Sequence, residues 1–168
     1  PGITIVEERL QTPCLGVIPF YRGLDLPQED GLEWERFQAH VREKRPDRLR
    51  IGIVNVPCVS NFTDFDGLLH EPDVEICKIE SHRSELVDLL IFPGTKQTGQ
   101  ALEFVKVRKI DHFAKQVLEA GGSVVGVCGG FQLLGETVSD PHQIESTVAN
   151  RKGLGLLSVT TVFAPIKV

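Results

Sequence analysis

The sequence predicts an α/β domain in which helices flank a mostly parallel sheet. Apolar segments of strand length occupy residues 49–56, 74–79, 87–92 and 123–127. Apolar residues at helical spacing from about residue 103 to 120 predict a helix between the third and fourth strands. Strands that alternate with helices are typical of parallel sheets covered on both faces. Since the carboxyl ends of parallel strands share one edge, we expect the reactive groups there.

The fourth strand segment ends at a cysteine bracketed by glycines. Gly126, Cys128 and Gly130 form G-x-C-x-G, the cysteine version of the G-x-S-x-G nucleophile elbow. In that elbow a sharp turn from strand to helix lifts the nucleophile above the sheet, and glycines permit the close backbone approach. A helix-compatible segment, 131–136, follows. A buried structural cysteine is the alternative, but glycines on both sides favour a nucleophile.

A second segment of interest, Pro93-Gly94-Thr95-Lys96, follows the third strand. A thiolate that attacks a carbonyl generates an oxyanion, and backbone N–H groups at a glycine turn are common stabilisers. Gly94 or Thr95 would supply one donor, and the N–H of Gly129 the other. These residues alone would indicate only an ordinary turn at the strand end, and beside an elbow the two interpretations are equally good.

A third segment, residues 60–66 (SNFTDFD), follows the first strand. Ser60, Thr63 and Asp64 are good helix-capping residues, so a capped helix start is one interpretation. The other interpretation is that Asn61 and Asp64 contact a substrate or a partner domain. The spacing leaves both open.

The composition excludes several classes of function. The 168 residues include 41% hydrophobic and 24% charged residues, which is typical of a globular domain. A net charge of −5 argues against nucleic acid or an anionic membrane as the main partner, and no apolar run is long enough to cross a bilayer. The four cysteines are widely spaced, so we expect no metal site and no disulfide framework, and a reducing cytoplasmic setting.

The first part of the chain differs in character. Residues 3–10 fit either a helix or a strand, residues 14–19 predict a strand, and residues 31–44 predict a helix that ends before Pro46. The sequence contains no methionine and begins with Pro1, so we expect it to be a piece of a longer protein.

Five strings in order resemble the glutamine amidotransferase domain of the cobyric acid synthase family, within the triad (class I) glutaminases. They are LGVIPF with LPQED (15–20, 26–30), SNFTDFD (60–66), LIFPGTKQT (90–98), GVCGGFQLLG (126–135) and GLGLL with TVF (153–157, 161–163). The resemblance implies a flavodoxin-like core that is incomplete at its C-terminus. It also implies that residues 1–46 are the end of a synthetase domain with its linker, and that 47–168 are the glutaminase domain without its C-terminal part.

The resemblance also implies a reaction. Cys128 would attack the carboxamide of glutamine, with Gly94 and Gly129 as the oxyanion hole and with Gln132 and Thr95 binding the substrate. The released ammonia would reach a synthetase domain that amidates carboxylates of a corrin ring, in cobalamin biosynthesis. ATP, magnesium and the corrinoid would bind to that domain. This chain has no G-x-x-x-x-G-K-[ST] loop and is expected to hold no cofactor.

The sequence departs from the family in its histidines. The family's histidine, which takes the proton of the cysteine, lies in a string well after GLGLL, and we expect it beyond Val168. None of the five histidines present has that context: His40, His70, His82, His112 and His142. The fragment is therefore expected to be a poor glutaminase whose Cys128 can still be alkylated. Cys58 also stands where the family more often has a basic residue.

Three other functions compete with this interpretation. A related glutaminase would serve another synthetase, such as one that amidates a peptidoglycan precursor. A catalytically inactive amidotransferase-like module would serve assembly only. A hydrolase or chaperone of the DJ-1 type shares the strand–cysteine–helix pattern but does not account for the other four strings. The SNFTDFD string and the N-terminal junction argue against the first of these.

Overall fold

The structure is a computed structural model that describes residues 2–17 and 47–165. The first helix, α1 (Gly2–Leu10), resolves the ambiguity of residues 3–10, and none of its residues is buried. The strand predicted at 14–19 is wrong for residues 14–17, which are exposed and form no regular structure, since no described strand pairs with them. Residues 18–19 of that prediction and the helix predicted at 31–44 lie outside the described residues.

Four parallel strands form the main sheet of the described chain. Their order is β2-β1-β3-β4, and all three pairings are parallel. The bounds are β1 Leu49–Val54, β2 Val74–Ile79, β3 Leu89–Phe92 and β4 Ser123–Gly126. The four predicted strands therefore exist, and the α/β class is confirmed.

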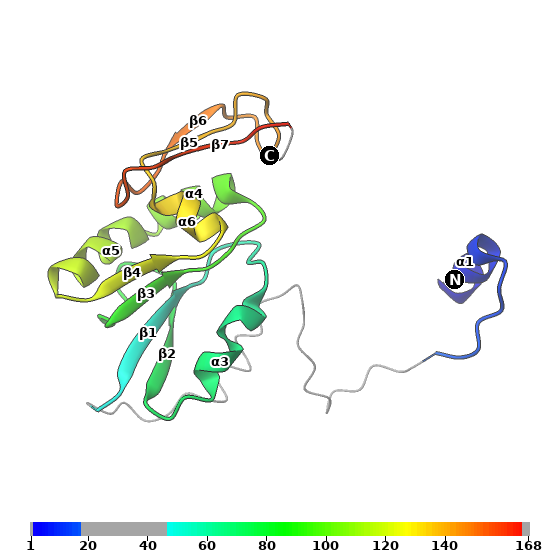
Figure 1. Cartoon of the computed structure of the whole chain (residues 1–168), viewed down its shortest axis with the longest axis horizontal. Helices are drawn as coiled ribbons and strands as arrows, with labels where there is room; N and C mark the ends of the chain where they lie inside the picture. The colour runs from blue at the N-terminus through cyan, green and yellow to red at the C-terminus, as the bar shows by residue number, and fades with distance from the viewer. Residues whose placement is uncertain (1, 18–46, 166–168) are drawn as a thin grey trace.

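Helices connect these strands on both sides of the sheet (Figure 1). The short η1 (Phe62–Phe65) and α3 (Asp66–Leu69) join β1 to β2, and α4 (Thr98–Val107) and α5 (Ile110–Glu119) join β3 to β4. Because β2 and β4 lie on opposite sides of the β1–β3 pair, right-handed crossovers place the two connections on opposite faces.

The single helix predicted at 103–120 is in fact two helices. The chain turns at Lys109, whose φ of 56° is left-handed and breaks the helical path. The turn lets Ile110 enter the core, where it is fully buried. Burial of this side chain offsets the cost of the unfavourable backbone conformation.

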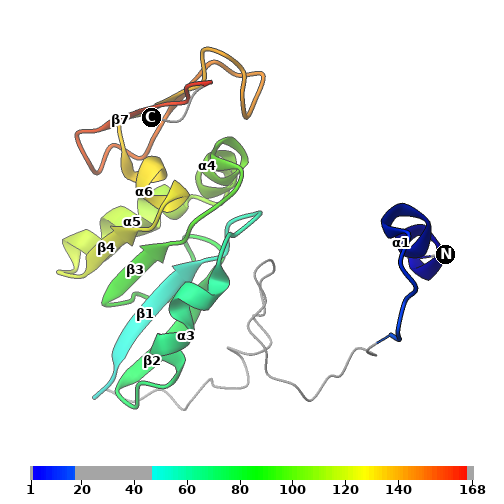
Figure 2. The same ribbon diagram turned by 45° about the vertical axis from the view of Figure 1, so that its right-hand side comes forward.

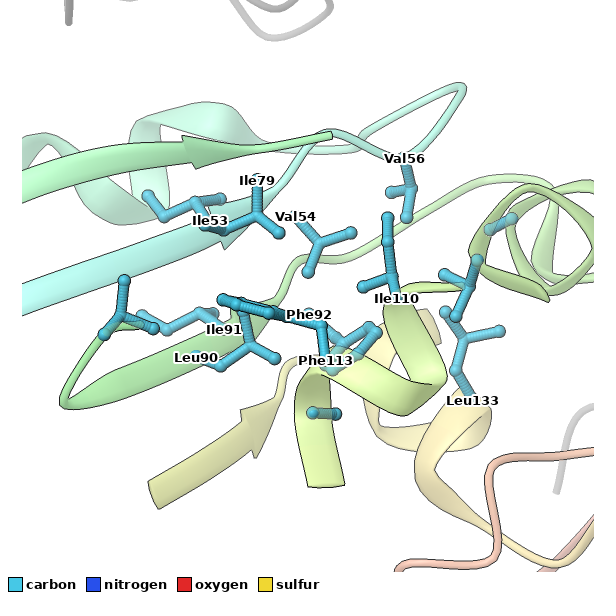
Figure 3. Packing of buried hydrophobic residues seen from close by; sticks show 14 of the residues in the cluster. Ile53, Val54, Val56, Ile79, Leu90, Ile91, Phe92, Ile110, Phe113 and Leu133 are labelled. Carbon is cyan, nitrogen blue, oxygen red and sulfur yellow. The ribbon is translucent and has the colours of Figure 1, made fainter. Parts of the chain in front are cut away.

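The core joins the sheet to α4, α5 and α6, and to Phe65 and Leu69 of the β1–β2 connection. Phe92 of β3 and Phe113 of α5 meet there, and both are almost fully buried (Figure 3). The largest other side chains with no appreciable exposure are Ile53, Ile79, Leu90, Leu102, Ile110 and Leu133.

The strand before the elbow is less buried than its valines suggest. β4 is at the edge of the sheet formed by the described residues, and Val125 is 44% exposed. A short run rich in valine is typical of a buried strand, but none of the four residues of β4 is buried. A strand paired on one side only leaves part of its apolar surface open.

A second, small sheet follows the elbow helix α6 (Gly129–Leu134) and lies above it in Figures 1 and 2. Its strands are β5 (Thr137–Ser139), β6 (Asn150–Lys152) and β7 (Thr160–Val162), in the order β6-β5-β7.

Among the described helices, none is long and apolar enough to cross a membrane.

Candidate active site

Cys128 connects the end of β4 to the start of α6. Its backbone angles, φ 50° and ψ −114°, belong to a region that residues with a side chain rarely adopt. The residue is exposed and its thiol is free. A strained, exposed residue between a strand and a helix is the geometry of a nucleophile elbow.

The glycines of the elbow permit close packing against the sheet. A Cβ on Gly130 would overlap the carbonyl oxygen of Phe92 and lie 2.7 Å from that of Pro93. A Cβ on Gly126 would lie 2.6 Å from the Cα of Phe131. Neither position can hold a larger residue unless the backbone moves, so the sharp turn depends on both glycines.

The turn after β3 lies directly against the elbow. A Cβ on Gly129 would lie 3.0 Å from the nitrogen of Thr95, and one on Gly94 would lie 3.6 Å from the Cβ of Cys128. Within the described residues, the N–H groups of Gly94, Thr95 and Gly129 donate to no protein acceptor. Three N–H groups without an acceptor among the described residues therefore lie near Cys128.

Two loops are joined at this edge of the sheet. Val59 and Thr95 form an isolated antiparallel bridge, and Ser60 donates its N–H to the carbonyl of Gly94 at 2.9 Å. Lys96 donates its N–H to the carbonyl of Cys58 at 3.0 Å. The loops after β1 and β3 thus hold each other in place through their backbones.

The predicted substrate-binding residues lie on both sides of this junction. The hydroxyl of Thr95, a buried residue, donates to the carbonyl of Pro57 at 3.1 Å, so this side chain fixes the loop. Gln132 lies on α6, one turn beyond Cys128. Its amide oxygen accepts a hydrogen bond from the hydroxyl of Thr98 at 3.1 Å. A role of Thr95 and Gln132 in binding glutamine stays a prediction, as does the oxyanion role of Gly94 and Gly129.

Asn61 and Asp64 are both exposed in the loop after β1. Asn61 has a left-handed φ of 52° and precedes η1, but its side chain makes no capping hydrogen bond. The helix start predicted at 60–66 is present, and the side-chain cap is not. A contact of either residue with a substrate or a partner domain stays a prediction.

The described histidines lie elsewhere. All four are exposed. A ring nitrogen of His82 is 3.4 Å from the carbonyl oxygen of Arg108, and His112 is 3.8 Å from the carboxylate of Asp111. No hydrogen bond joins a described histidine to the elbow.

Two features near the site were not predicted from the sequence. The first is the position of Ser60, which the sequence suggested only as a helix cap and whose hydroxyl is 2.8 Å from the point where a Cβ on Gly94 would lie. The second is the loop between β5 and β6. In it Glu145 accepts the N–H of Gly99, at the start of α4, at 2.9 Å. Arg151 lies over the same glycine and donates to the hydroxyl of Ser146.

The same loop is organised by Asp140. This side chain is buried, and its two oxygens accept the N–H groups of Ile144, Glu145 and Ser146 at 2.8 to 2.9 Å. Burial raises the pKa of the Asp140 carboxyl, but these three hydrogen bonds and the charge of Arg151 lower it by more. The pKa of Asp140 therefore lies below its ordinary value.

Known proteins resemble this chain in sequence and in fold. The cobyric acid synthase of Syntrophobacter fumaroxidans is 41% identical over 164 residues, which are 95% of this chain and 32% of that protein. That of Roseiflexus castenholzii is 42% identical over 168 residues, which are 99% of this chain and 33% of that protein. The chain thus spans about a third of the length of these relatives.

A solved structure of a peptidase E protein from Listeria monocytogenes EGD-e has a TM-score of 0.52 to this one. It is 11% identical, and the match covers 73% of this chain and 70% of that one, a likeness of fold alone. The model of the CobB/CobQ-like glutamine amidotransferase domain matches residues 50–168. This chain therefore belongs to the CobB/CobQ-like glutamine amidotransferase family, as the five sequence strings indicated.

Proposed function

We propose that this chain is the glutamine-hydrolysing part of a cobyric acid synthase. The observation that carries the proposal is the position of Cys128, an exposed cysteine in a strained elbow, beside the free N–H groups of Thr95 and Gly129. Membership of the amidotransferase family implies glutamine as the substrate. The likeness to cobyric acid synthases along nearly the whole chain supports the corrinoid pathway over other synthetases.

In the proposed reaction, the sulfur of Cys128 attacks the side-chain carbonyl carbon of glutamine. A carbon–sulfur bond forms, and the negative charge on the oxygen is stabilised by the N–H of Gly129 with that of Gly94 or Thr95. The carbon–nitrogen bond then breaks and ammonia leaves with the proton of the thiol. Water attacks the thioester, which releases glutamate and restores the thiol.

A base must carry the proton from the thiol to the leaving ammonia. No described histidine has a hydrogen bond to the elbow, and His82 and His112 contact other parts of the molecule, so the proposal takes this base from outside the described residues. We expect slow glutamate release wherever this base is not in place beside Cys128. Efficient release that the substitution Cys128→Ala abolishes would show that another group of this chain serves as the base.

The ammonia would serve ATP-dependent amidation of corrin-ring carboxylates by a synthetase domain, which would also bind ATP, magnesium and the corrinoid. Within the described residues, no group of three or more His, Cys, Asp or Glu side chains is placed to hold a metal ion. This chain's part in the reaction is then glutamine binding and thioester chemistry.

Protection of Cys128 from N-ethylmaleimide tests the proposal directly. We expect L-glutamine to slow the modification of Cys128 and to leave that of Cys58, an exposed cysteine on the neighbouring loop, unchanged. Cys128 is the only cysteine between Lys115 and Arg151, so its tryptic peptide reports on it alone. Equal modification with and without saturating glutamine would contradict the proposed function.

A further inference from the structure

The hydroxyl of Ser60 borders the same space as the nucleophile. It lies 2.8 Å from the point where a Cβ on Gly94 would be, and that point is 3.6 Å from the Cβ of Cys128. Glycine at position 94 therefore leaves room between the serine hydroxyl and the cysteine. A small group that reacts with Cys128 would occupy this room.

The backbone fixes Ser60 in this position. Its N–H donates to the carbonyl of Gly94 at 2.9 Å, and the adjacent Val59 pairs with Thr95. The hydroxyl is thus held by two loops whose other contacts position the elbow. A preorganised group of this kind binds a ligand without the cost of ordering a mobile side chain.

Ser60 is half-buried, and no hydrogen bond joins its hydroxyl to another described residue. A partly accessible hydroxyl of this kind is free to bind water or a ligand. A serine hydroxyl can both donate and accept. Ser60 is therefore able to bind either the oxygen or the N–H of a carboxamide.

The surrounding groups favour a hydrogen bond from the N–H of a carboxamide to the Ser60 hydroxyl. The free N–H groups of Thr95 and Gly129 lie together, since a Cβ on Gly129 would be 3.0 Å from the nitrogen of Thr95. They can serve the carbonyl oxygen of a carboxamide. Ser60 lies on the Gly94 side of Cys128. With Thr95 and Gly129 as the pair that binds the oxygen, the amide nitrogen of the same planar group is the part left for Ser60 to bind.

We propose that the Ser60 hydroxyl accepts a hydrogen bond from the amide nitrogen of the substrate glutamine and so positions the leaving group beside Cys128. The proposal rests on the proposed glutaminase function. In this role Ser60 distinguishes a carboxamide from groups of similar shape that carry no N–H. Glutamate γ-methyl ester is such a group, because an ester oxygen replaces the nitrogen.

The experiment compares the two ligands by their protection of Cys128 against N-ethylmaleimide. In the unaltered chain we expect glutamine to protect at lower concentration than the γ-methyl ester. In the variant Ser60→Ala we expect the half-protecting concentration of glutamine to rise about tenfold, as for one lost hydrogen bond, and that of the ester to stay within about twofold. Ser60→Thr, which keeps a hydroxyl, should restore much of the difference.

Ser123→Ala is the matched control, since it removes an exposed serine hydroxyl at the start of β4 and should alter neither ligand. Equal weakening of both ligands by Ser60→Ala, or of neither, would overturn the role of Ser60 while glutamine still protects the unaltered chain. Absence of protection in the unaltered chain would overturn the glutaminase function itself, and the role of Ser60 with it. The two failures are therefore distinguishable.

Discussion

Cys128 adopts a backbone conformation that is unfavourable for any residue with a Cβ. With φ 50° and ψ −114°, it occupies a region that glycine adopts readily, and the strain is of order 1–3 kcal/mol. The core that packs around the elbow holds the residue there, with Leu133 of α6 fully buried. At this position a residue with a side chain therefore lowers the stability of the fold.

The variants Cys128→Gly and Cys128→Ala test this at the scale of the residue. Both remove the thiol, but only glycine relieves the strain. After the larger unfolded-state entropy of glycine is subtracted, we expect Cys128→Gly to have a free energy of unfolding about 1 kcal/mol above that of Cys128→Ala. Urea denaturation monitored by circular dichroism measures the difference. An alanine variant as stable as the glycine variant would show that the elbow is unstrained.

The loop between β5 and β6 depends on one carboxylate. Since the pKa of Asp140 is depressed in the folded state, the hydrogen bonds to its oxygens stabilise the fold fully above the ordinary aspartate pKa of about 3.9. That contribution is lost as the pH falls through the depressed folded value, where the carboxyl takes up a proton.

We therefore expect Asp140→Asn to lower the melting temperature at pH 7, and to lower it less as the pH falls below about 4. Melting curves of both proteins across this range measure the effect. Glu80→Gln is a useful comparison, since the pKa of Glu80 is lowered chiefly by a hydrogen bond from Lys78 at an exposed site, which salt should weaken. A constant difference between Asp140→Asn and the unaltered chain at all pH values would contradict the assignment.

The segment GLGLL has a structural role at the end of α6. The N–H groups of Leu154 and Leu156 donate to the carbonyls of Leu133 and Leu134 at 2.9 Å. Carbonyls in the last turn of a helix have no partner within the helix, so this segment satisfies them. The string that helped to indicate the family from the sequence is therefore also the connection between α6 and the small sheet.

At the scale of the whole molecule, this connection decides whether the small sheet stays packed on the main domain. A Cβ on Gly153 would overlap the carbonyl of Gly135 and lie 3.2 Å from that of Leu133. We expect Gly153→Ala to lower the free energy of unfolding by roughly 1–3 kcal/mol, as overpacking commonly does. Limited proteolysis should then cut residues 136–165 before the main sheet.

Gly67→Ala provides the control for that experiment, because nothing lies within 4 Å of the added Cβ and Gly67 is in α3. Cleavage at the same rate in both variants would show that the segment does not depend on the close approach at Gly153.

The sequence predicted what depends on local pattern. The four strands and the elbow at Cys128 follow from apolar runs and glycine spacing, and they are present in the structure. The break at Lys109 was not predictable, because a lysine carries no local signal for a left-handed φ and the burial of Ile110 decides the turn. The position of Ser60 beside Cys128 was equally hidden, because it results from the pairing of two loops that are distant in sequence.

The bridge between Val59 and Thr95 has a consequence for how this site can change. The two loops are joined mainly by backbone hydrogen bonds, at Ser60 to Gly94 and at Lys96 to Cys58, which most substitutions would preserve. Exposed side chains on these loops can therefore be exchanged while the elbow keeps its shape, and at Cys58, whose φ is 54°, asparagine or glycine fits the backbone best. A library confined to these positions would sample new selectivity on an unchanged nucleophile, which makes this junction a natural starting point for directed evolution.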